Sequence, residues 1–160
     1  MLHEGAAGIG ISGNNIDVFI KYSNKAINNL NLNLGEKSYF VDFEFGPGEL
    51  SSLSAACEEL DSIKRIYGKG IEEPHIIVKD IIYKPSDLTV MGADKSSAKI
   101  VSDGVSFVKF KDKDFIQEAQ KYALGAITIY GRMNLNEFCG NVTPQVFIDD
   151  YEIKNAKALF

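Results

Sequence analysis

The chain has 160 residues, of which 45% are hydrophobic and 24% are charged, and its formal net charge is −5. This length suits one medium-sized domain or two small ones, with room for a substantial core. No apolar run approaches the roughly 18–20 residues that cross a bilayer, and no signal peptide is recognisable. Duplex-binding proteins usually carry a basic balance, so nucleic-acid binding here needs a local basic stripe combined with aromatic stacking. The two cysteines, Cys57 and Cys139, have no C-x-x-C spacing and are expected to be reduced thiols in or near the core of a cytoplasmic protein.

The first half of the chain predicts two amphipathic helices with a strand between them. Apolar residues recur at helical spacing from Asn15 to Leu30 and again from Leu50 to Ile66. The stretch from Tyr39 to Phe45 alternates between apolar and acidic residues, as a half-buried strand does. Gly46-Pro47-Gly48 between this strand and the second helix is a turn signal.

The second half predicts short strands and hairpins. Asp103-Gly104 is the strongest hairpin signal, and Gly140-Asn141 marks a second hairpin. The expected strands are 75–83, 88–91, 99–102, 105–111, 126–135 and 142–153, with a short helix over 115–122. This order is typical of an OB barrel, although an SH3-like barrel or a split sandwich shares much of it. The sequence therefore predicts an α+β protein, with an N-terminal helical/β segment followed by a five-stranded OB-type β-barrel.

The sequence predicts no catalytic residue and no metal site. Metal-dependent phosphodiester cleavage needs clustered Asp and His ligands, but the chain has only His3 and His75. The neighbours in the acidic pair Asp149-Asp150 point to opposite sides of an extended backbone. Gly8 to Gly13 matches the letters G-x-G-x-x-G, but the strand that must precede a dinucleotide fingerprint has no room, so a glycine-rich turn is the better interpretation.

Lysine and arginine side chains alternate with aromatic side chains in the second half of the chain, a pattern that indicates binding of single-stranded nucleic acid. Lysines follow phosphates and flat rings stack on bases, which is how single strands are bound without sequence readout. The predicted nucleic-acid-binding residues are Lys99, Phe107, Lys109, Lys111, Lys113, Tyr130, Arg132 and Asn134. The alternative is that Phe107, Phe110 and Tyr130 are barrel core and that the lysines only solvate a surface.

Strand alternation decides which of these side chains share a face. Phe107, Lys109 and Lys111 lie on one face of their strand, and Val108 and Phe110 on the other. We predict that the Phe107 face points outward and that Val108 and Phe110 point inward.

The closing strand carries a second prediction of register. Proline lacks an N–H, so Pro144-Gln145 should open this strand. Val146 and Ile148 are expected to face the core, because Gln145 and Asp149 would be costly to bury unpaired. Phe147 then lies outside the barrel, either as a stacking platform or, as we favour, under the helix at 50–66.

Several segments resemble RecJ-type single-strand-specific exonucleases. The run from Lys99 to Ile153 is similar to the C-terminal OB domain of that family, in the "V-K-F" strand end, the "G-R-x-N-x-N-E-F-x-G" hairpin and the closing "P-Q-x-F-I-x-D-Y". Glu49 to Pro74 is similar to the family's acidic helix and the loop that follows it, although Ile71-Glu72 depart from the loop pattern. His3 to Gly8 (HEGAAG) resembles the Gly-Gly-His-x-x-Ala-Ala-Gly segment of the DHHA1-type domain, with Met1-Leu2 in place of the two glycines.

The resemblance implies the C-terminal part of such an exonuclease, without its catalytic DHH domain. It implies a DHHA1-like remnant at 1–35, a strand-helix connector packed on the barrel at 36–74 and the OB domain at 75–160. The expected partner is single-stranded DNA in repair or recombination, bound weakly by this chain alone. A DHH nuclease subunit or a single-strand-binding protein is the alternative partner. No cofactor is expected in this chain, because the Mn or Mg of the family belongs to the DHH domain.

Overall fold

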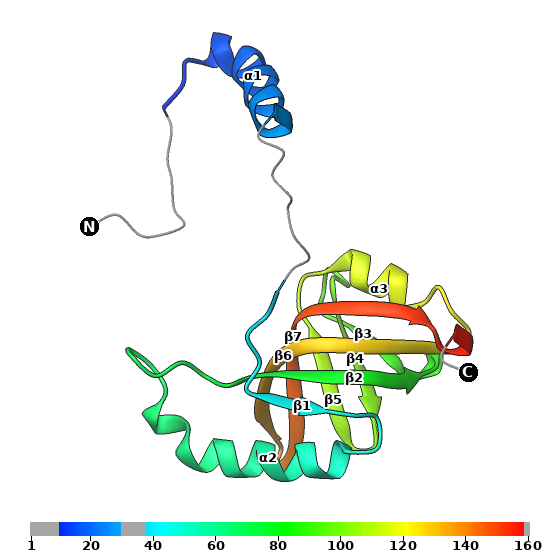
Figure 1. The fold of residues 1–160 in the computed structure, drawn as a ribbon. Helices are drawn as coiled ribbons and strands as arrows, with labels where there is room; N and C mark the ends of the chain where they lie inside the picture. Colours follow the sequence, from blue (N-terminus) through cyan, green and yellow to red (C-terminus); the bar gives the residue numbers. More distant parts are fainter. Residues whose placement is uncertain (1–9, 30–37, 159–160) are drawn as a thin grey trace. The chain divides into compact units, whose positions relative to one another are not determined.

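The computed structural model describes residues 10–29 and 38–158, which form a mixed α+β protein. The chain divides into two compact units, residues 1–38 and 39–160. In the first unit a short 3-10 turn, Gly13–Asn15, leads into α1, Ile16–Asn29 (Figure 1). The helix predicted over 15–30 is therefore confirmed, whereas His3 and Gly8 lie outside the described residues. Within the described ranges, the helices lack the length and apolar character needed to cross a membrane.

The second unit contains two further helices and one sheet (Figure 1). Its elements are β1 (Phe43–Phe45), α2 (Leu50–Ile63), β2 (His75–Tyr83), β3 (Leu88–Met91), β4 (Ser97–Ser102), β5 (Val105–Lys109), α3 (Lys113–Ala119), β6 (Gly125–Phe138) and β7 (Asn141–Asn155). A 3-10 turn at Lys64–Ile66 extends α2, so the predicted helix from 50 to 66 is helical along its whole length. The strands predicted at 75–83 and 88–91 are also confirmed.

The described strands form a seven-stranded sheet in the order β1-β2-β6-β7-β5-β4-β3. The predicted five-stranded barrel is not confirmed, because β1 and β3 are the two edges of an open sheet. Two local features account for the larger number of strands. β1 pairs parallel with β2, and Pro85, which cannot donate a backbone hydrogen bond, begins the 3-10 turn Pro85–Asp87 that separates β2 from β3.

Both predicted hairpins exist, and their turns have the left-handed backbone that two-residue loops require. Asp103 and Gly104, with φ of 46° and 80°, join β4 to β5 as predicted. Cys139 and Gly140, with φ of 50° and 78°, join β6 to β7, one residue earlier than the predicted Gly140-Asn141. Cys139 is consequently exposed rather than part of the core, whereas Cys57 is buried on α2.

The inner face of the sheet carries the hydrophobic core. Ile100, Phe107, Val146 and Met133 face one another in register across β4, β5, β7 and β6. Leu53 of α2 and Phe115 of α3 pack into the same core. The prediction that Val146 and Ile148 face inward is confirmed, since they are 0% and 5% exposed.

The predicted orientation of β5 is wrong. Phe107 is completely buried, and Phe110, which we expected inside, is 58% exposed. Phe107 pairs with Val146, so the register with β7 turns its face toward the core. Val108 is also buried, but it lies on the outer face and not on the inner face as predicted.

The position of Pro144 also differs from the prediction. β7 begins at Asn141, and Pro144 lies within it, opposite Leu135 of β6. Pairing of β7 with β5 begins only at Gln145. The proline therefore lies where β7 has a neighbour on one side alone, the position in a sheet where a missing N–H is tolerated.

Candidate nucleic-acid interface

A row of side chains crosses the outer face of the sheet. Residues paired in a ladder point to the same side of it. The strand register aligns Lys99 of β4, Val108 of β5, Phe147 of β7, Arg132 of β6 and His75 of β2. We call these five residues the outer row. They lie on the face opposite the buried row of Phe107 and Val146.

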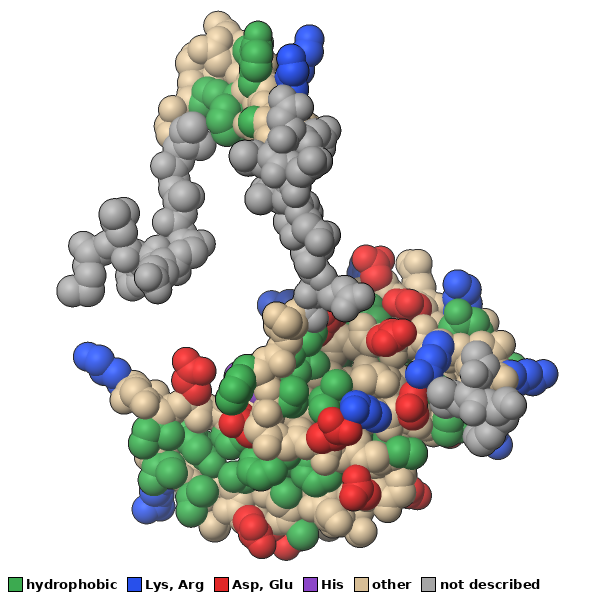
Figure 2. Space-filling model, in the orientation of Figure 1, with side chains coloured by type: hydrophobic (Ala, Val, Ile, Leu, Met, Phe, Trp, Pro, Cys, Tyr) green, Lys and Arg blue, Asp and Glu red, His purple; other side chains and the backbone are tan. Residues whose placement is uncertain are grey.

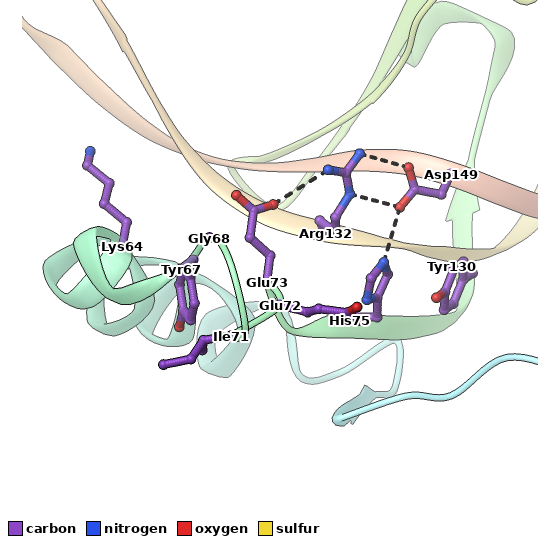
Figure 3. A pocket seen from close by; sticks show the side chains of 10 residues that line it. All are labelled: Lys64, Tyr67, Gly68, Ile71, Glu72, Glu73, His75, Tyr130, Arg132 and Asp149. Carbon is purple, nitrogen blue, oxygen red and sulfur yellow. Dashed lines mark hydrogen bonds and ion pairs between the residues drawn. The ribbon is translucent and has the colours of Figure 1, made fainter. Parts of the chain in front are cut away.

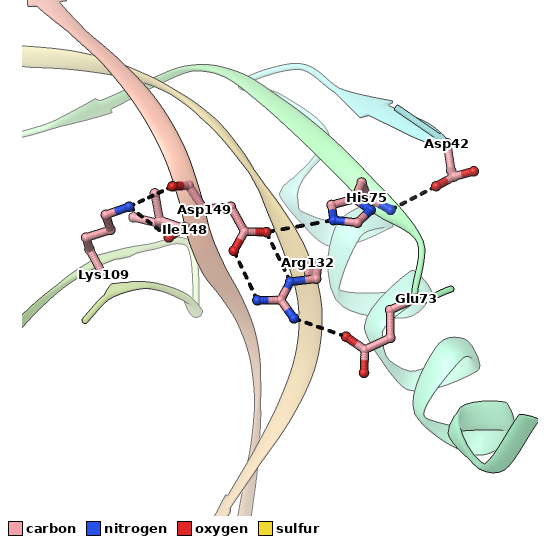
Figure 4. Close-up of polar contacts among 7 residues, drawn as sticks. All are labelled: Asp42, Glu73, His75, Lys109, Arg132, Ile148 and Asp149. Atoms are coloured by element: carbon pink, nitrogen blue, oxygen red, sulfur yellow. Dashed lines mark hydrogen bonds and ion pairs between the residues drawn. The ribbon is translucent and has the colours of Figure 1, made fainter. Parts of the chain in front are cut away.

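Arg132 is the best-anchored member of the outer row (Figure 4). Its Nε and Nη2 atoms each donate to a carboxylate oxygen of Asp149 at 3.0 Å, and its Nη1 lies 3.5 Å from Glu73 Oε2. Hydrogen bonding to the Asp149 carboxylate raises the pKa of the Arg132 guanidinium. Because Glu73 precedes β2 and Asp149 lies on β7, the guanidinium links two segments on either side of β6.

Asp149 lies at a β-bulge of β7 next to Arg132. Tyr130 pairs with Asp150, and the next residue, Gly131, pairs with Ile148, so Asp149 is the extra residue of the bulge. Its carboxylate also lies 3.9 Å from His75 Nε2. Alternation along β7 already places Asp149 on the face of Phe147, and the bulge brings Asp150, the partner of Tyr130, to the same face.

Three rings stack next to this ion-paired group. Tyr39 and Tyr130 have ring centroids 4.1 Å apart, and His75 stacks on Tyr130 at 5.2 Å with an interplanar angle of 6°. The Tyr39 hydroxyl donates to the Asp150 carboxylate, and the backbone N–H of His75 donates to the Asp42 carboxylate at 2.8 Å. Burial raises the pKa of the Tyr130 hydroxyl, and the nearby carboxylates of Asp149 and Asp42 act in the same direction. Stacking therefore holds the three rings together, and hydrogen bonds fix the Tyr39 hydroxyl and the His75 backbone.

An open pocket of about 730 Å³ adjoins the outer row (Figure 3). Tyr67 and Ile71 line it from the segment after α2, and His75, Arg132 and Asp149 line it from the sheet. Lys64, Gly68, Glu72, Glu73 and Tyr130 complete the lining. Apolar surface, flat rings and a guanidinium together suit a planar, polar ligand. In the described ranges no group of three or more His, Cys, Asp or Glu side chains is arranged to hold a metal ion.

The sheet brings three predicted binding residues to its outer face. Lys99 and Arg132 belong to the outer row, and Tyr130 contacts His75 of that row. Lys111 and Lys113 are exposed just after β5, and Asn134 is exposed on β6. The binding roles of these six residues stay predictions.

Phe107 and Lys109 are not placed as expected. Phe107 belongs to the core and has no surface to offer a ligand. The Lys109 side chain is only 15% exposed, and its ammonium donates to the backbone carbonyls of Asp149 at 2.7 Å and Ile148 at 3.3 Å (Figure 4). It also lies over the Tyr151 ring, 5.6 Å from the centroid. Lys109 therefore anchors β5 to the bulge of β7.

Sequence reasoning did not include several residues of this surface in the predicted site. His75, Glu73 and Asp149 enter through the pairing of β2 with β6 and through the bulge. His75 at the start of an apolar strand was the one available signal, since a polar ring there suggests an outer face. The sequence prediction places Phe110 in the core because it inverts the orientation of β5.

The comparisons with known proteins confirm the resemblance to RecJ-type exonucleases. No protein-family model matches the chain. The chain is 27% identical over 158 residues to YorK of Bacillus subtilis strain 168, which is named as an SPbeta prophage-derived single-strand DNA-specific exonuclease, and equally to YorK of Bacillus phage SPbeta. These matches cover 97% of this chain and 27% of each relative, so the chain spans about a quarter of their length.

Solved structures show the same relationship in the fold. RecJ of Thermus thermophilus, crystallised with Mn²⁺, superposes with a TM-score of 0.54 and 17% identity, over 90% of this chain and 20% of RecJ. The Mg²⁺ complex of the same RecJ gives the same TM-score over 89% of this chain and 21% of RecJ. The second unit and its sheet thus belong to a RecJ-like fold.

Proposed function

We propose that this chain is a single-stranded nucleic-acid-binding OB module of a RecJ-like exonuclease, which positions the substrate for a nuclease core outside the 160 residues. The outer row carries the proposal, because it places Lys99 and Arg132 on one face together with Phe147 and the His75–Tyr130 stack. Cations that follow phosphates and rings that accept bases are the two components of single-strand binding without sequence readout. We further propose that the module acts in the cytoplasm, in DNA repair or recombination.

The strand order supports an OB-type arrangement. β2 and β3 are separated only by the turn that Pro85 begins, and they lie at opposite ends of the order β2-β6-β7-β5-β4-β3. If they are counted as one bent first strand, the order becomes 1-4-5-3-2-1, with α3 between the third and fourth strands. This is the arrangement of a five-stranded Greek-key barrel that binds oligonucleotides on one face. On this view β1 is an addition from the connector at 36–74, which packs α2 against the domain at 75–160.

The charge distribution predicts weak binding. The net charge is −5, and Asp149 and Glu73 already neutralise Arg132. Few phosphate contacts are therefore available, and we expect a Kd on the order of micromolar or weaker at physiological salt.

Fluorescence anisotropy with labelled oligothymidylate of about 20 nucleotides tests the proposal, since one OB fold covers roughly 4–16 nucleotides. The Lys99→Gln variant should bind more weakly, and Arg132→Gln should do so to a smaller extent, because Arg132 is already paired with Asp149 and Glu73. The slope of log K against log salt should shrink by about 0.7 for each lost phosphate contact. Lys121→Gln, an exposed lysine outside the outer row, is the matched control. The proposal is wrong if the wild-type chain does not bind at low salt, or if a variant that combines Lys99→Gln with Arg132→Gln keeps the wild-type affinity and slope.

A protein-interaction module is the second candidate. Exposed apolar side chains gather where α2 ends (Figure 2): Ile63, Ile66 and Ile71 are 45%, 54% and 50% exposed. Such a patch on a net-acidic chain fits a docking role, with a DHH nuclease subunit or a single-strand-binding protein as partner. Loss of partner binding in Ile66→Asp, with oligothymidylate binding unchanged, would distinguish this role from the first.

A further inference from the structure

Phe110 and Phe147 form an aromatic pair that the core does not use. Their ring centroids are 5.7 Å apart with an interplanar angle of 49°, and Phe110 is 58% exposed. Phe147 is half-buried and stands in the outer row between Val108 and Arg132. The tilted contact leaves much of the Phe110 ring open to solvent while Phe147 supports it from the sheet.

The residues on both sides of Phe110 are hydrogen-bonded to the sheet. On one side, the Lys109 ammonium is bonded to the carbonyls of Ile148 and Asp149. On the other side, the Lys111 N–H donates to Ser97 Oγ at 3.1 Å, and the Asp112 N–H donates to the Ser96 carbonyl at 2.7 Å. Phe110 is thus an exposed ring on a fixed segment. A ring that is already ordered loses less conformational entropy when a ligand covers it.

Cations and a second set of rings share the face. Lys99 lies two strands from Phe147 on one side, and Arg132 lies one strand away on the other. His75, which stacks on Tyr130, lies two strands from Phe147, a separation of about 9.5 Å at the usual strand spacing. Two aromatic surfaces therefore flank Arg132.

We propose that Phe110, supported by Phe147, stacks on an unpaired nucleobase, and that the His75–Tyr130 stack receives a second base of the same strand. The inference rests on the proposed function and adds to it the base-binding positions and a reason for single-strand preference. In a duplex, successive bases of a strand are about 3.4 Å apart and are covered on both faces. Phe147, which supports Phe110, and His75 are about 9.5 Å apart on the sheet, a spacing that fits a strand whose bases are unstacked.

The test measures binding of the full chain to labelled oligothymidylate and to a duplex of equal length. Phe110→Ala should weaken single-strand binding at least about fivefold, as expected for loss of one stacked base. The salt slope should stay unchanged, because no cation is removed. Phe110→Trp should restore binding, whereas Phe110→Leu, which keeps apolar bulk without a ring face, should not. Phe138→Ala is the matched control, since Phe138 is 72% exposed at the end of β6.

The outcomes separate this inference from the function on which it rests. If Phe110→Ala or Phe110→Leu binds as the wild type while Lys99→Gln still weakens binding, Phe110 is not a stacking position and the proposed function stands. Equal losses in Phe110→Ala and Phe138→Ala would indicate general apolar adhesion and also overturn the inference. A wild-type chain that binds no single strand refutes the proposed function and this inference together.

Discussion

Val146 lies on the inner face of the sheet, between Phe107 on β5 and Met133 on β6, and it is fully buried. Val146→Ala removes two methyl groups from a packed site, so the free energy of unfolding should fall by about 1–3 kcal/mol. Urea denaturation measures the loss. Val101→Ala, on an exposed position of β4, should change stability by less than about 0.5 kcal/mol. Equal stability of the Val146→Ala chain and the wild type would contradict this packing.

At the same scale, sequence alternation predicted which residues of a strand share a face but not always which face is inside. The predicted inner face of β7 is correct, because Gln145 and Asp149 share the face opposite Val146 and Ile148 and would be costly to bury. The predicted inner face of β5 is wrong. Lys109 and Lys111 suggested that the face of Phe107 is solvated, but both Phe107 and Val108 are buried. Lys109 shares the parity of Phe107, yet its long side chain reaches the carbonyls of β7 from the end of the strand.

At the scale of elements, the bulge of β7 depends on the close approach of Gly131. A Cβ at this position would lie 2.1 Å from the Phe147 carbonyl oxygen. Gly131→Ala should therefore push β7 away from β6, lower stability by roughly 1–3 kcal/mol or more and loosen the Arg132–Asp149 pair. Thermal unfolding measures the first effect. Gly48→Ala, where a Cβ meets nothing within 4 Å, is the control, and equal stability of the two variants would contradict this account.

Elements with a local signal were predictable and long-range pairings were not. An amphipathic stretch predicts α2, and an Asp-Gly turn predicts the β4–β5 hairpin, in each case through neighbouring residues. The addition of three-residue β1 to β2 depends on a parallel pairing between residues 43–45 and 76–78, for which the sequence has no local signal. For the same reason the contact of Glu73 with Arg132, and with it part of the site, could not be derived.

At the scale of the whole molecule, we expect the purified chain to have no Mn- or Mg-dependent nuclease activity. Its role in our proposal is to hold a single strand, and its carboxylates and two histidines are not expected to build a two-metal site. Release of labelled nucleotides from single-stranded DNA measures the activity. Digestion that follows this protein in constant proportion through several purification steps would refute the expectation.

The most direct test of the central claim is to map backbone amide chemical shifts while oligothymidylate is added to the isotopically labelled chain. Binding on the outer face predicts the largest changes at Lys99, Phe110 and Arg132 and in the segment around His75, with little change in α3. Changes confined to α3 or to the segment after α2, or no changes at concentrations well above micromolar, would contradict the account.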